Sequence, residues 1–382
     1  MQAKSGERSW NKYRKRLRLG AVEPYAPERR FRHFGVMPVM DEPEELPATL
    51  AAAGRALAGF SEPAALLLVI NHPADASDSC REHDLALLAE LRAGARFGVA
   101  ENRLFWIDAA SPGREPTQGV GEARRIGMDT ALSLLDPADF ADSLLFSLDA
   151  DAWLRPDYFT KVRAAFRAHP EAGAASIGFR HRRGRDAAEE AAIRAYEAYL
   201  ARYVEALRAA GSPYAFQTVG SAMAARASAY IACGGMRVRQ AGEDFYFLQA
   251  LRKAAPVIEV AEVLVEPAPR PSWRVPFGTG KAVGDLLRGG ALPAFPEAGF
   301  AALKVLLQAA SGERLADPER FRAALPLSTA AWLEAAGFFR QWPKVLANVP
   351  PRPEARRKAF DDWFDGLKTR QFIRAGGGDQ SP

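Results

Sequence analysis

The sequence predicts an α/β fold: a mostly parallel central sheet flanked by helices, with a mainly helical C-terminal region. Two observations lead to this prediction. Between residues 31 and 182, short apolar runs alternate with stretches of helical period, which is typical of βαβ units. From about residue 281 to residue 372, helical patterns dominate. The 382 residues, 48% of them hydrophobic, suffice for one large domain with additions or for two domains.

The elements of the first part follow one another as strand and helix. Strands are predicted for the apolar runs at 31–40, 65–70, 103–110, 143–150 and 173–179. Helices are predicted for the segments between them, at 43–59, 82–94, 121–135 and 156–169. In open sheets of this kind, ligands bind beyond the carboxyl ends of the strands. The residues just after each strand are therefore the first candidates for a functional site.

The second half begins with a long predicted helix at 186–211, where strong helix formers carry apolar residues at helical spacing. A helix at 243–254 and a strand at 257–267 follow. The proline-rich stretch after Pro267 is interpreted as an ordered loop, because Trp273 and Phe277 offer apolar anchors. Helical segments then continue to a frayed tail.

Composition limits the classes of function. The two cysteines, Cys80 and Cys233, exclude a disulfide framework and suit a reducing compartment. The net charge of +5 is modest for this length and does not favour nucleic-acid binding. The apolar run at 64–70 is far shorter than the ~20 residues that cross a bilayer. We therefore expect a cytoplasmic protein without a membrane span.

Residues 1–30 are basic and show no sustained apolar period, which predicts an arm or a segment that lies on the surface. One interpretation is peripheral contact with an anionic membrane, to which each basic residue contributes about 1 kcal/mol. The other is a solvated basic tail.

Asp149 and Asp151 end the fourth predicted strand, in the run LLFSLDAD. Residues two apart in an extended chain point to the same side. Two carboxylates placed so closely repel unless a cation lies beside them, and Mg²⁺ or Mn²⁺ binds one or two carboxylates together with phosphate oxygens. This D-x-D triplet therefore indicates a metal and phosphate site. The alternative is that the two aspartates lie in a solvated turn between strand and loop.

Glu243 and Asp244 stand at the start of a predicted amphipathic helix, after the glycines 234 and 235. The positive end of the helix dipole favours the ionised form of a carboxyl there. Such a carboxylate could accept a proton from a hydroxyl. The alternative is helix capping by acids.

Two further stretches carry cations. In GVGEARRIGMDTAL, Arg124 and Arg125 lie near a helix start, which suits phosphate or an acidic partner. In PSWRVPFGTGK, Trp273 could stack on a sugar or base, and Arg274 or Lys281 could pair with a diphosphate. A surface loop pinned by the tryptophan is the alternative. The histidines form no H-E-x-x-H or similar pattern and are set aside.

Taken in order, VMPVMDEPEELPATL, GVGEARRIGMDTA, LLFSLDADAWLRPDYF, VGSAMAARASAYIACGGM and AGEDFYFLQAL resemble the inverting glycosyltransferases of family 2, which have the GT-A fold. The resemblance runs from about Phe34 to Glu266. It implies a catalytic domain at 31–268, preceded by the arm at 1–30 and followed at 269–382 by an active-site loop and a helical region.

The resemblance assigns roles residue by residue. Pro38 to Glu42 match the end of the family's first strand, and Arg124 matches the arginine of its mid-domain helix. Asp149 and Asp151 match its D-x-D motif, and Asp244 matches the aspartate of its Glu-Asp pair. In the family, an aspartate after the second strand contacts the nucleotide base. It has no direct match in INHPADASD, so Asn71 or Asp75 would have to take this role.

The implied reaction moves a sugar from a nucleotide-diphosphate donor, with a UDP-sugar favoured, to a glycan or lipid-linked acceptor in bacterial surface glycan synthesis. Mn²⁺ or Mg²⁺ would bridge the D-x-D to the diphosphate, and Asp244 would deprotonate the acceptor. No histidine follows His181 to act as a late metal ligand, and the Q-x-x-R-W motif of processive synthases is absent. The residues that select sugar and acceptor are expected at 178–220 and in the C-terminal region.

Two other functions fit parts of the pattern. A sugar nucleotidyltransferase uses a related sheet, but its Gly-rich opening ending in Arg and Lys is absent from VMPVMDEPEEL. A non-catalytic scaffold or carbohydrate-binding subunit would keep the fold with disrupted acidic motifs, whereas both acidic pairs are intact here.

Overall fold

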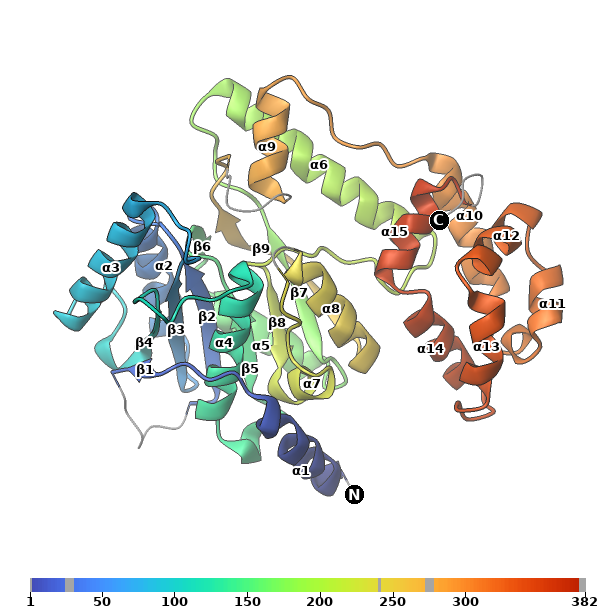
Figure 1. The fold of residues 1–382 in the computed structure, drawn as a ribbon, viewed down its shortest axis with the longest axis horizontal. Helices are drawn as coiled ribbons and strands as arrows, with labels where there is room; N and C mark the ends of the chain where they lie inside the picture. Colours follow the sequence, from blue (N-terminus) through green and yellow to red (C-terminus); the bar gives the residue numbers. More distant parts are fainter. Residues whose placement is uncertain (1, 25–30, 240–241, 272–277, 378–382) are drawn as a thin grey trace. The chain divides into compact units, whose positions relative to one another are not determined.

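The computed structural model describes residues 2–24, 31–239, 242–271 and 278–377. The chain divides into two compact units, which we call the sheet unit and the helical unit (Figure 1). The sheet unit comprises residues 1–194 and 218–289, and the helical unit comprises residues 195–217 and 290–382. Residues 195–217 thus group with the C-terminal helices, and residues 269–289 group with the sheet.

Within the described residues, nine strands form one sheet in the order β1-β4-β3-β2-β5-β8-β7-β9-β6. They are β1 (Val22–Glu23), β2 (His33–Val39), β3 (Ala64–Asn71), β4 (Leu104–Ala109), β5 (Leu144–Ser147), β6 (Ala152–Leu154), β7 (Ala174–Phe179), β8 (Met223–Arg226) and β9 (Val257–Pro267). Strands β4, β3, β2 and β5 run parallel to one another, whereas β8 is antiparallel to both of its neighbours. The carboxyl ends of β2, β3 and β5 therefore meet at one edge.

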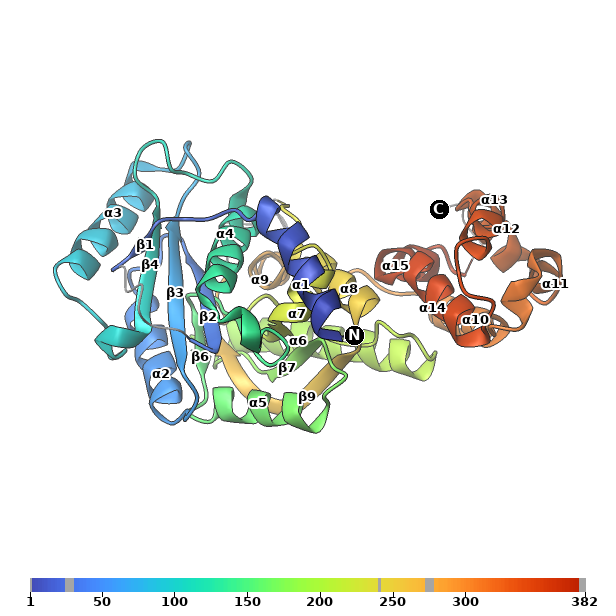
Figure 2. The same cartoon turned by 90° about the horizontal axis from the view of Figure 1, so that it is seen from below.

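Helices cover both faces of this sheet (Figure 2). The helices of the sheet unit are α1 (Gln2–Tyr13), α2 (Leu46–Ala58), α3 (Asp78–Arg92), α4 (Gly119–Leu134), α5 (Tyr158–Ala168), α7 (Ala227–Ala232), α8 (Glu243–Ala254) and α9 (Thr279–Leu287), with the start of α6 (Ala187–Ala209). Apolar side chains of α2, α3 and α5 join those of β2, β3 and β5 in one buried core. Removal of this apolar surface from water is the main stabilising contribution.

Helix α4 packs on β2 and β3 at unusually short range. A Cβ atom on Gly127 would stand 2.4 Å from Cγ1 of Val36 and 2.8 Å from Cγ2 of Val69. Only glycine allows this approach, because real Cβ atoms do not come that close to other carbons. The close contact fixes the helix whose first turns carry Arg124.

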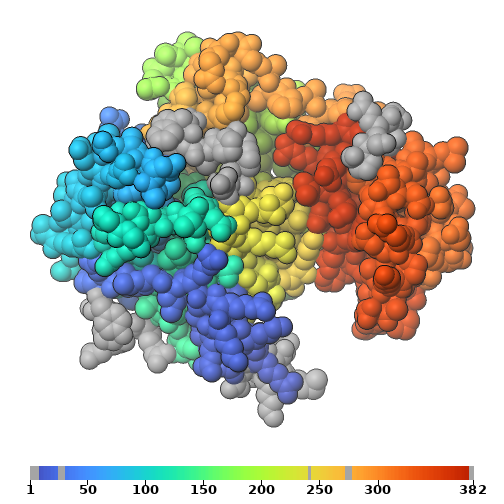
Figure 3. Space-filling view, viewed as in Figure 1, coloured from blue at the N-terminus to red at the C-terminus, as the bar shows by residue number. Residues whose placement is uncertain are grey.

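The N-terminal segment is tied to α4 through the buried carboxylate of Asp129. The hydroxyls of Tyr13 and Tyr230 donate to Oδ1 of Asp129 at 2.6 and 2.7 Å. The backbone N–H of Arg18 donates to its Oδ2 at 2.9 Å, and Nε of Arg125 lies 3.3 Å from the same oxygen. Part of the predicted arm is thus a helix and an extended segment that lie on the surface of the sheet unit, drawn in dark blue in Figure 3.

Replacing Asp129 is expected to destabilise the fold strongly. Asp129→Ala leaves two buried tyrosine hydroxyls and a partly buried arginine without their partner, which costs about 3–5 kcal/mol of unfolding free energy. Urea denaturation measures this loss. Asp139→Ala, which removes one of the exposed partners of Arg32, should cost no more than about 1 kcal/mol. Equal losses for the two variants would contradict this account.

The helical unit has its own core. Its helices are the later part of α6 with α10 (Glu297–Ala309), α11 (Pro318–Ala323), α12 (Leu327–Ala335), α13 (Phe338–Leu346), α14 (Pro353–Trp363) and α15 (Gly366–Arg374). Trp332, Trp342 and Phe360 are among its fully buried side chains. Helices α12 and α13 are separate, because Gly337 between them has φ 79°, which α-helical geometry does not allow.

The fold class predicted from the sequence is confirmed: a sheet flanked by helices, with a mainly helical C-terminal region. Among the described strands the sheet is mixed, with four parallel and four antiparallel pairings. The prediction missed β1, β6 and β8, which have only two to four residues each. Among the described residues, no helix combines the length and the apolar character that a bilayer crossing requires.

Candidate active site

Asp149 lies two residues after the end of β5, and Asp151 lies in the turn that leads into β6, at the edge where the parallel strands end. The N–H of Leu148 donates to the carbonyl of Val36 at 2.9 Å, so β5 stays paired with β2 up to the residue before Asp149. The side chains of Asp149 and Asp151 keep 35% and 27% of their surface exposed. A buried strand thus presents two accessible carboxylates from a fixed backbone.

Arg124 on α4 connects Asp149 with the start of α8. Its side chain is only 3% exposed. Nη2 donates to Oδ1 of Asp149 at 2.7 Å, and Nη1 donates to Oγ of Ser147 at 2.7 Å and to the carbonyl of Leu148 at 3.0 Å. Its Nε lies 3.5 Å from Oε1 of Glu243. One buried guanidinium therefore orders the end of β5 and also forms an ion pair with Glu243 at the start of α8.

Helix α8 begins with Glu243 and Asp244, after Gly242 in the left-handed region at φ 70°. The N–H of Phe245 donates to Oδ1 of Asp244 at 2.7 Å. Burial, followed by the charge of Glu243, raises the pKa of Asp244 to about 7, and burial also raises the pKa of Glu243. A carboxyl with a pKa near neutrality can take up and release a proton at physiological pH, as a general base must.

The opposite side of the D-x-D is held by two arginines. Nη2 of Arg270 forms an ion pair with the buried carboxylate of Glu42 and lies 3.4 Å from Oδ2 of Asp151. Nη2 of Arg182 donates to Oε2 of Glu45 at 2.6 Å and to the carbonyl of Asp151 at 3.3 Å. The predicted residue Glu42 is thereby linked to Asp151 through Arg270.

Asp149 and Asp151 are the residues of this cluster that could hold a hard divalent cation. Asp149 and Asp151 supply carboxylate oxygens, and their partial exposure leaves room for waters and phosphate oxygens in the remaining coordination positions. The cluster, as defined by the contacts above, has six acidic side chains against three arginines: Glu42, Glu45, Asp149, Asp151, Glu243 and Asp244 against Arg124, Arg182 and Arg270. This excess of acid also favours a bound cation.

Other predicted residues take different positions. Pro38 is buried in β2 beside Val69. Asn71 is buried at the end of β3, where its Nδ2 donates to the carbonyls of Val39 and Val69 at 3.1 and 2.9 Å, so its amide group ties two strand ends together. Lys281 forms an ion pair with Asp285 within α9 at 2.6 Å. Trp273 and Arg274 lie outside the described residues.

Sequence reasoning missed Arg182 and Arg270. Arg182 belongs to the basic run HRRGR, and its guanidinium lies over the ring of Trp153, 4.1 Å from the centroid. Arg270 stands between two prolines at the end of β9. The basic run and the proline pair can be recognised in the sequence. Neither of them indicates which carboxylate Arg182 or Arg270 contacts in the fold.

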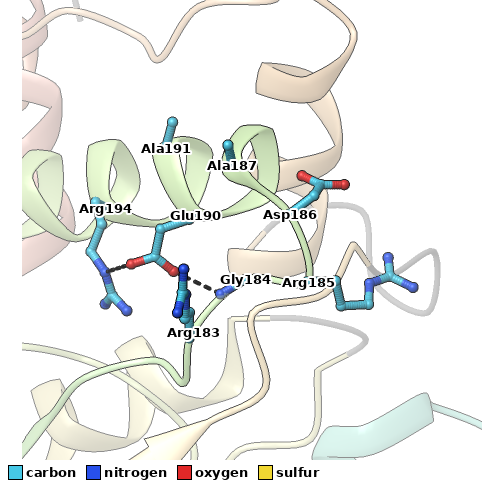
Figure 4. Close-up of a pocket in the computed structure, with 8 residues that line it drawn as sticks. All are labelled: Arg183, Gly184, Arg185, Asp186, Ala187, Glu190, Ala191 and Arg194. Atoms are coloured by element: carbon cyan, nitrogen blue, oxygen red, sulfur yellow. Dashed lines mark hydrogen bonds and ion pairs between the residues drawn. The ribbon is translucent and has the colours of Figure 1, made fainter.

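A pocket of about 400 Å³ lies beside the start of α6 (Figure 4). Five of the eight residues that line it are charged; the lining comprises Arg183, Gly184, Arg185, Asp186, Ala187, Glu190, Ala191 and Arg194. Glu190 accepts from the N–H of Gly184 at 2.7 Å and from Nε of Arg194 at 2.8 Å. The pocket follows directly on Arg182, which contacts the backbone of Asp151.

No family model matches the chain, and no curated protein matches it in sequence. Solved structures resemble it distantly. The mannosyltransferase PcManGT from Pyrobaculum calidifontis, solved with GDP-Man and Mn²⁺, has 14% identity over 94% of both chains and a TM-score of 0.39. TarS 1–349 from S. aureus has 13% identity over 90% of this chain and 92% of its own, with a TM-score of 0.37.

Glucosyl-3-phosphoglycerate synthase from Mycobacterium tuberculosis, solved with Mn²⁺, UDP and phosphoglyceric acid, has 12% identity over 72% of this chain and 78% of its own, with a TM-score of 0.36. Similarities this distant leave the functional argument to the side chains of the site itself.

Proposed function

We propose that the chain is a metal-dependent inverting glycosyltransferase that moves a sugar from a nucleotide-diphosphate sugar to an acceptor hydroxyl. One observation carries the proposal: buried Arg124 connects the first acid of the D-x-D, Asp149, with Glu243 at the start of α8. Two motifs that resemble glycosyltransferase family 2 are thereby parts of one network. The proposed reaction needs a cation site for the diphosphate and, next to it, a carboxyl that can accept a proton.

In this proposal Asp151 and Asp149 hold Mn²⁺ or Mg²⁺ together with the diphosphate of the donor. When bound, the cation stabilises the negative charge that develops on the departing nucleoside diphosphate. Pro38 and Glu42 border the nucleotide at the end of β2, and Asn71 orders the neighbouring end of β3. A UDP-sugar is favoured as donor, with Trp273, Arg274 and Lys281 assigned to donor contacts.

Asp244 acts as the base. Its carboxylate takes the proton of the acceptor hydroxyl while the hydroxyl oxygen bonds to the anomeric carbon and the bond from that carbon to the diphosphate oxygen breaks. The bonding electrons leave with the nucleoside diphosphate. A single displacement of this kind inverts the anomeric centre, through a transition state that resembles an oxocarbenium ion. Glu243 and Arg124 set the charge around the base.

The acceptor is proposed to be a glycan or a lipid-linked sugar of a bacterial surface glycan. Arg182 reaches the backbone of Asp151, and the pocket of Figure 4 begins at the next residue. This supports an acceptor that approaches along the segment before α6. Because that pocket is lined by charged side chains, hydrogen bonds to hydroxyls or anionic groups would select the acceptor.

Removal of the metal is expected to weaken donor binding ~10-fold or more. Transfer and hydrolysis are measured across a panel of nucleotide sugars with Mn²⁺, with Mg²⁺ and with chelator. Asp151→Asn loses a charged ligand, so the Mn²⁺ concentration that gives half-maximal activity should rise ~10-fold or more. Asp157→Asn, which removes a surface ion pair with Lys161 shortly after the D-x-D, is the matched control and should behave like the wild type.

The same panel separates the alternatives. Formation of a nucleotide sugar from a sugar phosphate and a nucleoside triphosphate would indicate a nucleotidyltransferase instead. Donor-independent glycan binding without turnover would indicate a scaffold subunit. Activity that is unchanged in chelator and in Asp151→Asn would overturn the metal assignment alone.

The N-terminal segment is proposed to touch anionic membranes peripherally. Arg14, Lys15 and Arg16 are exposed, and Leu19 keeps 59% of its surface exposed beside them. Binding to vesicles with anionic lipid should weaken steeply between low and high salt, since the contact is electrostatic. Replacing these three basic residues with Gln should reduce vesicle binding by about 3 kcal/mol at most. Equal binding to neutral vesicles would contradict the proposal.

A further inference from the structure

His72, Cys80 and Asp84 form a buried cluster that the proposed reaction does not use. His72 follows β3, whereas Cys80 and Asp84 lie one turn apart on the same face of α3. One ligand atom from each residue, a ring nitrogen, a thiol sulfur and a carboxylate oxygen, lies within 4.8 Å of the other two. All three residues are 1% exposed.

The separations between these atoms are those of ligands around one small cation. Nδ1 of His72 lies 3.1 Å from Oδ2 of Asp84, and Sγ of Cys80 lies 3.8 Å from the same oxygen. A tetrahedral Zn²⁺ with ordinary bond lengths would place nitrogen and oxygen ~3.4 Å apart and sulfur and oxygen ~3.6 Å apart. The cluster therefore differs from zinc geometry by a few tenths of an ångström.

The charge and the surroundings of Asp84 also favour a cation. Its hydrogen-bond and ion-pair partners among the described residues include no lysine or arginine. The backbone N–H of Asp41 donates to its Oδ1 at 2.9 Å and leaves Oδ2 directed at His72 and Cys80. Such an outer hydrogen bond orients a metal-binding carboxylate.

We propose that His72, Cys80 and Asp84 bind one Zn²⁺, with a water molecule in the fourth position. The thiol of Cys80 releases its proton to solvent on binding, and His72 binds through Nδ1 as neutral imidazole. Sulfur and imidazole ligands select zinc over Mg²⁺ and Mn²⁺, which suit the all-oxygen set of Asp149 and Asp151. The ion would fasten the β3–α3 loop to α3 and, through Asp41, the end of β2.

This proposal does not depend on the proposed transferase function. The full chain is stripped with chelator, reloaded with Zn²⁺ and analysed for metal by mass spectrometry; Co²⁺ replaces zinc for spectroscopy. We expect one tightly bound Zn²⁺ per chain and a thiolate-to-cobalt charge-transfer band. Both should persist in Asp151→Asn and in Cys233→Ser, which alters a cysteine outside the cluster.

In Cys80→Ser the cobalt band should disappear and zinc affinity should fall by more than the ~10–100-fold that loss of an outer partner costs. Near-UV circular dichroism confirms that the variant is folded, and His72→Asn supplies a second test by zinc content. A folded wild-type chain that retains no zinc and gives no cobalt–thiolate band would overturn the proposal. So would a band that survives in Cys80→Ser.

Discussion

Asp244→Asn is expected to lower kcat by about 10²–10⁴-fold while donor binding stays near the wild-type level. The amide keeps the shape of the side chain and can still accept from the N–H of Phe245, but it cannot take a proton from the acceptor. Single-turnover kinetics with a saturating donor isolate this step from binding and release. A variant that turns over within ~3-fold of the wild type would show that another group is the base.

The same residue sets an expected pH profile. Burial and then the charge of Glu243 raise the pKa of Asp244 to about 7, and a base works only when it is deprotonated. Activity should therefore rise with pH up to about 7 and level off above it. In Asp244→Asn this rise of activity with pH should disappear. The residual activity should be nearly independent of pH between 5 and 8, roughly the range in which such a carboxyl titrates.

The stability of Asp244→Asn provides an internal control. In the unfolded chain an aspartate has a pKa near 3.9, so the folded protein binds the extra proton at pH values between that and about 7. The contribution of Asp244 to the free energy of unfolding therefore falls as pH rises through that window. The amide that replaces the carboxyl does not titrate, so the variant should be less sensitive to pH and at least as stable at pH 8. If Asp244→Asn lost much of its stability, its low activity would be explained by misfolding and not by the missing base.

Arg124→Met is expected to cost about 3–5 kcal/mol of unfolding free energy, because it leaves the carboxylates of Asp149 and Glu243 near one another without their shared cation. Urea denaturation measures the loss. Arg155→Met is the matched control: this arginine is 57% exposed, and its ion pair with Glu266 spans 3.6 Å, so its removal should cost less than about 1 kcal/mol.

A second measurement on Arg124→Met separates positioning from bulk stability. The guanidinium lowers the pKa of Asp244, against burial and Glu243, which raise it. Without Arg124, the rising limb of the pH–rate profile should move to higher pH. Arg124→Lys keeps the charge without the planar fork, so it should recover most of that shift but not the full stability. An unmoved pH limb in Arg124→Met would contradict electrostatic coupling between the two motifs.

Local pattern is enough to predict most of the sheet unit. Strands β2, β3 and β4 are long apolar runs that bury both faces, and such runs are easily recognised. Strands β6 and β8 have three and four residues, too few for a periodic signal. The grouping of residues 195–217 with the C-terminal helices depends on contacts distant in sequence, so no local pattern reveals it.

The site divides in a similar way. Its acids can be predicted because they follow a strand or begin a helix, positions that are evident in the sequence. The partners of Asp151 escape prediction because Arg182 and Arg270 come from loops whose course is set by the assembled sheet. His72, Cys80 and Asp84 do not form an H-E-x-x-H or similar pattern in the sequence. The fold brings the end of β3 onto α3, and only then do the three ligand atoms converge.

The most direct test of the central claim is calorimetric titration of Asp244→Asn with nucleotide sugars in Mn²⁺ and in chelator, since this variant should bind the donor without consuming it. The account predicts that at least one nucleotide sugar binds in Mn²⁺ and that its affinity falls ~10-fold or more in chelator and in the double variant with Asp151→Asn. Failure of every nucleotide sugar to bind in either Mn²⁺ or Mg²⁺ would contradict the claim that Asp149 and Asp151 form a donor site.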